Sequence, residues 1–100
     1  MELNEDILDK NYVNFNVYEK NGIKYLRCSG YPKANMTMGT EYPAGTLPAL
    51  YRPKRSITLY TNFDGLNVCR LLIETTGDIT IKTYRDVKTT EPMNIYMSYV

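Results

Sequence analysis

Hydrophobic and polar residues alternate along most of the chain, which is the period-two pattern of half-buried β-strands. Apolar residues take every second position at the start of the segments 13–18, 56–60 and 79–84. The run 66–75 is the most apolar and predicts a central strand. About six strands separated by turn residues predict an all-β chain.

The first two strands are predicted to form a hairpin. Asn21-Gly22 joins them, and this dipeptide favours a tight turn because both residues tolerate a positive φ. On the returning strand, the face that carries Leu26 and Cys28 is expected to point into the core.

The segment 29–55 has few regular signals and predicts a long ordered loop, with one short strand near residues 36–39. It contains four of the five prolines, each of which lacks a backbone donor and restrains the residue before it: Pro32, Pro43, Pro48 and Pro53. Residues 61–65 predict a turn and residues 85–92 a polar loop.

The chain predicts one domain, residues 11–100, preceded by an N-terminal arm or linker remnant over residues 1–10. That first segment is the only one with helical spacing, and its acidic start argues against a signal peptide. No stretch is apolar enough for a transmembrane helix, so no membrane association is expected.

Composition excludes several classes of function. The net charge is +1, with 12 basic and 11 acidic residues, so the basic footprint of a nucleic-acid binder is missing. Histidine is absent, and no Gly-rich phosphate loop precedes a helix. Two cysteines, Cys28 and Cys69, are too few for a Cys₄ zinc site. We therefore expect no enzyme, metal or cofactor.

The sequence leaves two alternatives for the two cysteines, reduced thiols or a disulfide. We expect Cys28 and Cys69 to be reduced and half-buried on strands, because free cysteine is a commonly buried residue. A disulfide is the alternative, provided that the fold brings the two Cα atoms within about 7 Å of each other.

The order of several short motifs is more informative than any one of them. Gly45-Thr46-Leu47-Pro48 is followed by Tyr51-Arg52-Pro53, then by the hairpin return Gly77-Asp78-Ile79-Thr80-Ile81, and the last strand closes on Met97-Ser98-Tyr99-Val100. Over about residues 12–100 this order resembles the C-terminal head domain of bacteriophage tail-fibre and baseplate receptor-binding proteins.

The resemblance implies a small antiparallel β-sandwich of jelly-roll type that forms a homotrimer at the tip of a fibre. It implies a non-enzymatic virion protein, made in the bacterial cytoplasm, that recognises a host cell-surface polysaccharide or another receptor. The alternative is a structural module of the tail or baseplate, used for trimerisation and for docking to another virion protein. A polysaccharide-cleaving enzyme that uses Asp64 or Asp86 is a third class, which we do not expect.

Ten tyrosines against two phenylalanines and no tryptophan are the unusual feature of the composition. Saccharide sites combine an aromatic face with amide, carboxylate and guanidinium groups. We expect such a site among residues predicted to lie in loops: Tyr31, Tyr42, Asn62, Asp64, Tyr84, Arg85 and Asp86. The other tyrosines are expected to pack in or beside strands.

Two further groups have predicted structural roles. A scaffold motif is expected to fix the long loop, with Arg52 bonding to loop carbonyls; its members are Leu47, Pro48, Tyr51, Arg52 and Pro53. The last strand is apolar on both faces, so it is either central in a sheet or covered by a neighbour. We expect Ile95, Met97 and Tyr99 to lie at a trimer interface.

Overall fold

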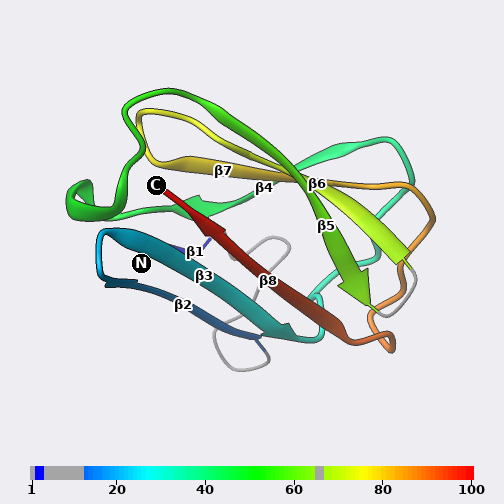
Figure 1. The fold of residues 1–100 in the computed structure, drawn as a ribbon. Coiled ribbons are helices and arrows are strands. Elements are labelled where there is room, and N and C mark those ends of the chain that lie inside the picture. Colours follow the sequence, from blue (N-terminus) through cyan, green and yellow to red (C-terminus); the bar gives the residue numbers. More distant parts are fainter. Residues whose placement is uncertain (1, 4–12, 65–66) are drawn as a thin grey trace.

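The computed structural model describes residues 2–3, 13–64 and 67–100, and shows two antiparallel sheets packed as a sandwich (Figure 1). The larger sheet has the strand order β1-β4-β7-β6-β5 and the smaller has the order β2-β3-β8. The predicted all-β antiparallel sandwich is confirmed. The strands are β1 (Glu2–Leu3), β2 (Val13–Lys20), β3 (Ile23–Gly30), β4 (Glu41–Thr46), β5 (Ile57–Asp64), β6 (Asn67–Ile73), β7 (Asp78–Thr83) and β8 (Met93–Tyr99).

The core lies between the inner faces of the two sheets. β6 is central, between β5 and β7, and its inward residues Cys69, Leu71 and Ile73 are buried against Ile79 and Ile81 of β7. The central strand predicted from the apolar run is confirmed. In the described part of the chain, no helix is long and apolar enough to span a membrane.

The β2–β3 hairpin forms as predicted. Asn21 and Gly22 both have positive φ, 54° and 80°, so the two-residue turn matches the twist of its strands. Leu26 and Cys28 of β3 are fully buried, and the predicted core face of this strand is confirmed.

Two predicted boundaries are wrong. The loop predicted over 41–46 is strand β4, and the strand predicted near 36–39 reduces to an isolated bridge between Met36 and Val87. Pro43 lies at a register irregularity between Pro43 and Gly45 in the β4–β7 ladder, and such irregularities are one of the places where a strand accommodates proline.

The turn predicted over 61–65 is wrong as well. β5 continues through Asp64, and Phe63 is buried in the core at 1% exposure. Residues 65–66 lie outside the described part of the chain. The predicted arm over residues 1–10 is described only at Glu2–Leu3, which pair with β4, so the division into arm and domain stays a prediction.

The interface predicted for β8 needs correction. Ile95, Met97 and Tyr99 point into the core of their own chain and are at most 6% exposed, so a second chain cannot reach them. Asn94, Tyr96 and Ser98 occupy the outward face instead. β8 looked apolar on both faces because Tyr96 is an exposed aromatic residue.

Cys28 and Cys69 are free thiols. Both are fully buried in the core, whereas the sequence predicted them to be half-buried. Burial raises the pKa of each thiol to about 12, and the nearby Cys69 contributes to the rise at Cys28. Both thiols therefore stay protonated at neutral pH.

A clamp at one end of the sandwich fixes the segment 47–53, which includes the short helix η1 (Ala49–Tyr51). The Leu47 N–H donates to the Gly77 carbonyl at 2.9 Å, and the Arg52 Nε donates to the Leu47 carbonyl at 3.1 Å. The Tyr99 hydroxyl donates to the Tyr51 carbonyl at 2.7 Å and ties β8 to the same segment.

We predict that Gly77→Ala destabilises the fold by about 3 kcal/mol, because a close contact adds to backbone strain. Gly77 has a φ of +91°, and an added Cβ would lie 2.7 Å from the Leu47 carbonyl oxygen. Gly39→Ala is the matched control, since Gly39 has a φ of +79° and open space around it. It should cost about 1 kcal/mol in urea denaturation. Equal costs for both variants would contradict the clamp.

We predict that Tyr99→Phe lowers the free energy of unfolding by about 1 kcal/mol at neutral pH, since the Tyr51 carbonyl loses its donor. Burial and the neighbouring Tyr51 raise the pKa of Tyr99 from 10.0 to about 12. The unfolded chain therefore releases this proton first, and the wild type loses stability as the pH rises between these values. Urea denaturation across that range should show a shallower loss for Tyr99→Phe. Parallel curves would contradict the assignment.

Candidate functional site

A shallow pocket lies where the two sheets meet, along the seam between the edge strands β5 and β8. Thr61 and Asn62 of β5 line it from one side, and Asn94 and Tyr96 of β8 from the other. Its volume is about 270 Å³. The Thr61 hydroxyl donates to the Tyr96 carbonyl at 3.3 Å. This hydrogen bond links the two sheets here, where β5 and β8 share no backbone ladder. We call this the seam pocket.

Three tyrosines extend from the seam pocket over the outer face of the smaller sheet. The rings of Tyr18 and Tyr25 stack with centroids 5.1 Å apart, and Tyr25 and Tyr96 are 6.4 Å apart. Register explains the grouping, because Tyr18 pairs with Tyr25 and Tyr96 lies diagonally across from Tyr25 on β8. Tyr18, Tyr25 and Tyr96 form what we call the tyrosine cluster.

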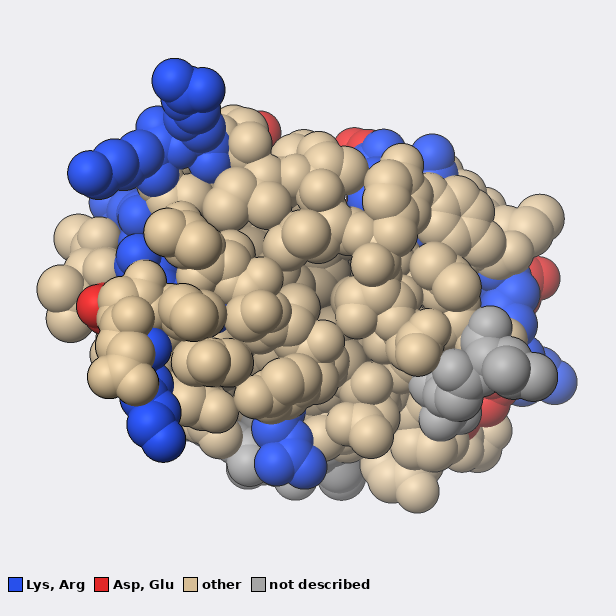
Figure 2. All heavy atoms as spheres, viewed as in Figure 1, with Lys and Arg blue, Asp and Glu red and all other residues tan. Residues whose placement is uncertain are grey.

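Two hydroxyls of the tyrosine cluster contact each other. The Tyr18 and Tyr96 hydroxyls are 3.4 Å apart and share a hydrogen bond, which is the main cause that raises the pKa of Tyr96. Figure 2 shows that the face over β5 and β8 is almost free of charged side chains, which gather at its margins. The surface therefore offers aromatic rings, amides and hydroxyls, with the Arg27 charge beside Tyr96.

A second aromatic pair lies on the outer face of the larger sheet. Tyr60 and Tyr84 stack with centroids 6.4 Å apart, and the Lys82 Nζ lies 6.0 Å from the centre of the Tyr84 ring. Burial, and then the hydrogen bond with Tyr60, raise the pKa of Tyr84. Tyr60 and Asn62 are two residues apart in β5 and so lie on the same face of this strand.

Comparison with solved structures finds a similar fold in a phage protein. The head domain of the lactococcal phage bIL170 superposes with a TM-score of 0.61, and the match covers 99% of this chain and 94% of that one. The chain has the fold of a phage receptor-binding head domain. Sequence identity is 16%, so the likeness establishes the fold alone. No protein-family model and no curated protein sequence matches the chain.

The crystal structure of that bIL170 head domain was described in asking whether lactococcal phages share a common fold for their receptor-binding domains. The resemblance predicted from the Leu47–Pro53 motif and the hairpin return at Gly77 is thus confirmed at the level of fold. In the present chain that motif forms the clamp, in which the Arg52 Nε donates to a loop carbonyl.

The structure separates the residues predicted to bind saccharide. Asn62 lines the seam pocket, but it does so from a strand rather than from a turn. Tyr31 is exposed just after β3. Tyr42 is half-buried against the core, and its hydroxyl accepts the Thr37 N–H at 2.7 Å, which lowers the pKa of Tyr42. The side chain of Asp64 lies outside the described part of the structure.

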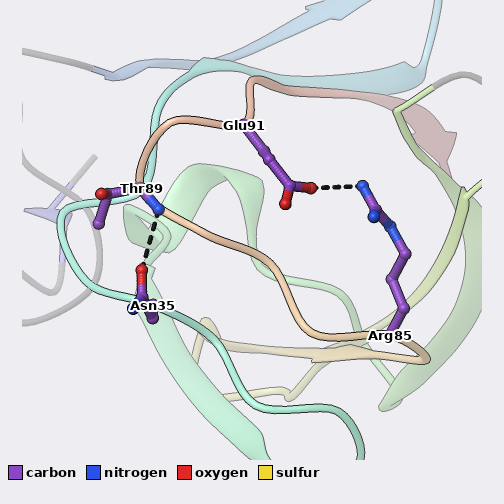
Figure 3. A network of polar contacts seen from close by, with 4 residues as sticks. All are labelled: Asn35, Arg85, Thr89 and Glu91. Carbon is purple, nitrogen blue, oxygen red and sulfur yellow. Dashed lines mark hydrogen bonds and ion pairs between the residues drawn. The ribbon is translucent and has the colours of Figure 1, made fainter.

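The remaining two predicted residues hold loops together. Asp86 accepts the Met38 N–H at 2.9 Å, which ties the loop after β7 to the loop before β4. Arg85 pairs with Glu91 within the loop before β8, and the Asn35 side chain accepts the Thr89 N–H at 3.0 Å (Figure 3). These polar groups are largely engaged in fixing the end of the sandwich.

Sequence reasoning missed most of the seam pocket and the tyrosine cluster. Their signal was present, because Asn94 and Tyr96 alternate with buried residues of β8 and so belong to its outward face. Among the described residues, no group of three His, Cys, Asp or Glu side chains is placed to hold a metal ion. The chemistry that the site offers is hydrogen bonding beside aromatic rings.

Proposed function

We propose that the chain is a non-enzymatic receptor-binding head domain in a phage tail or baseplate, and that it attaches the particle to a host cell-surface saccharide. The observation that carries this proposal is the seam pocket, which two asparagines line together with an exposed tyrosine. The fold shared with the bIL170 head domain supports the receptor-binding role.

The chemistry of the seam pocket suits a sugar. A sugar ring presents C–H groups on its faces and hydroxyls around its edge. Each asparagine amide both donates and accepts hydrogen bonds, so Asn62 and Asn94 match hydroxyls in either role. Tyr96 supplies an aromatic face that is 53% exposed. Arg27, the exposed ladder partner of Tyr96, adds a guanidinium donor beside the ring.

Single sugar contacts of this kind are weak, so we infer that attachment relies on several copies. A homotrimer, repeated over many fibres or baseplate positions, multiplies weak contacts through avidity. Because Ile95, Met97 and Tyr99 are buried, the proposed interface uses exposed side chains instead. Tyr31 and Tyr84, both nearly half exposed, are proposed as additional receptor contacts at the loop end.

We predict that Tyr96→Ala and Asn94→Ala each weaken binding to host cell-wall polysaccharide by about 5- to 10-fold, through the loss of a ring contact or a hydrogen bond. Binding would be measured on a glycan array and by cell-wall pull-down, with melting temperatures to show that each variant folds. Tyr31→Ala and Tyr84→Ala are the matched truncations away from the seam pocket and should have smaller effects.

Three outcomes of that experiment are informative. Loss of binding in Tyr31→Ala or Tyr84→Ala alone would move the site to the loops and refute the seam assignment. Absence of binding to any host surface, together with tight binding to a purified tail or baseplate protein, would replace the receptor proposal with the structural-module alternative. Release of reducing ends from the polysaccharide would contradict the non-enzymatic proposal.

We predict a homotrimer in solution. Sedimentation equilibrium at micromolar concentration should give about three times the chain mass of 11.6 kDa. A mass near 11.6 kDa at that concentration would contradict the trimer, and avidity would then have to come from the particle alone.

A further inference from the structure

A second and larger pocket lies at the opposite end of the same two strands. It has a volume of about 510 Å³ and is bordered by Ile57 at the start of β5 and by Val100 just after β8. The seam pocket uses Thr61 and Asn94, near the other ends of these strands. The two pockets therefore lie apart along β5 and β8.

The lining of this second pocket is strongly basic. Lys24, Arg52, Lys54 and Arg55 all border it, and we call it the basic pocket. Four cations outnumber one carboxylate. The lining therefore keeps a net positive charge even where Val100 carries a free carboxylate. Figure 2 shows Lys and Arg side chains gathered at this end of the molecule, where β5 begins.

These cations are not neutralised within the described part of the chain. The ion pairs found there join Arg70 to Glu41 and Arg85 to Glu91, both outside the basic pocket. Lys24 instead lies over the ring of Tyr99, with its Nζ 5.9 Å from the ring centre. Positive charge without a carboxylate partner attracts an anionic ligand.

The rest of the lining is aliphatic and exposed. Leu50 is 73% exposed and Val100 is 85% exposed, while Ile57 is half-buried beside them. No aromatic ring lines the basic pocket, in contrast to the seam pocket with Tyr96. Aliphatic walls suit a leucine or isoleucine side chain better than a sugar ring, whose faces pack on aromatic rings.

The clamp makes this pocket rigid before any ligand arrives. Arg52 is held by its hydrogen bond to the Leu47 carbonyl, and the carbonyl of Tyr51 accepts the Tyr99 hydroxyl. The segment that carries Leu50, Arg52 and Lys54 therefore loses little conformational freedom on binding, and a preformed site binds more tightly than a mobile one.

We propose that the basic pocket docks an acidic segment of a partner protein, with carboxylates beside Lys54 and Arg55 and an aliphatic side chain seated against Leu50 and Ile57. This proposal goes beyond the receptor-binding role and does not depend on it. The separation of the two pockets allows a partner and a saccharide to be bound at the same time.

The test uses a fluorescein-labelled acidic peptide that contains two leucines, measured by fluorescence anisotropy with the full chain. Lys54→Glu/Arg55→Glu should weaken binding by at least about 10-fold, because it replaces two attractions with two repulsions. Lys33→Glu/Lys88→Glu is the matched control, since it makes the same change in net charge at exposed loop positions outside the pocket. It should weaken binding by less than about 3-fold.

Leu50→Ser tests the aliphatic part of the site without changing charge, and should weaken peptide binding by about 5-fold. Equal losses in the two charge-reversal variants would overturn the proposal, since they would indicate general electrostatic attraction. Poly-glutamate binding as tightly as the peptide, with no effect of Leu50→Ser, would also overturn it. Tighter binding of inorganic polyphosphate than of the peptide would replace the protein partner with a phosphate polymer.

Discussion

The structure depends on one constraint, which is that the inner faces of two small sheets must exclude water from a shared core. Strands β6, β7 and β8 meet this constraint by alternation, with every second residue along most of each strand buried. Their outward residues are then free to carry function. Tyr96 is exposed for the same reason that Ile95 and Met97 are buried, since neighbours in a strand point to opposite faces.

The junction of the two sheets explains why both pockets occur where they do. β5 and β8 are edge strands that lie along each other without a continuous ladder, so side chains rather than backbone bonds fill the seam. Amides and a tyrosine line one end of this junction, and cations with aliphatic side chains line the other. The proposed saccharide site and the proposed partner site thus differ in charge and in aromatic content.

Sequence reasoning succeeded where the signal is local. Asn21-Gly22 identified its hairpin because both residues accept positive φ, and the apolar run of β6 identified a central strand. It failed where the outcome depends on distant neighbours. Pro43 lies in β4 at a register irregularity of the ladder with β7, and β5 continues past the predicted turn because Phe63 packs into the core. The seam pocket is lined by residues of β5 and β8, and no local sequence pattern indicates that these two strands lie side by side.

In the proposed function, the seam pocket holds the receptor saccharide. The most direct measurement is an NMR titration of isotope-labelled protein with soluble host cell-wall polysaccharide, followed through the side-chain amide groups of Asn62 and Asn94. We expect saturable shifts in both amide groups and in the Tyr96 ring. Shifts confined to the loops around Tyr31 and Tyr84, or to the basic pocket, would contradict it.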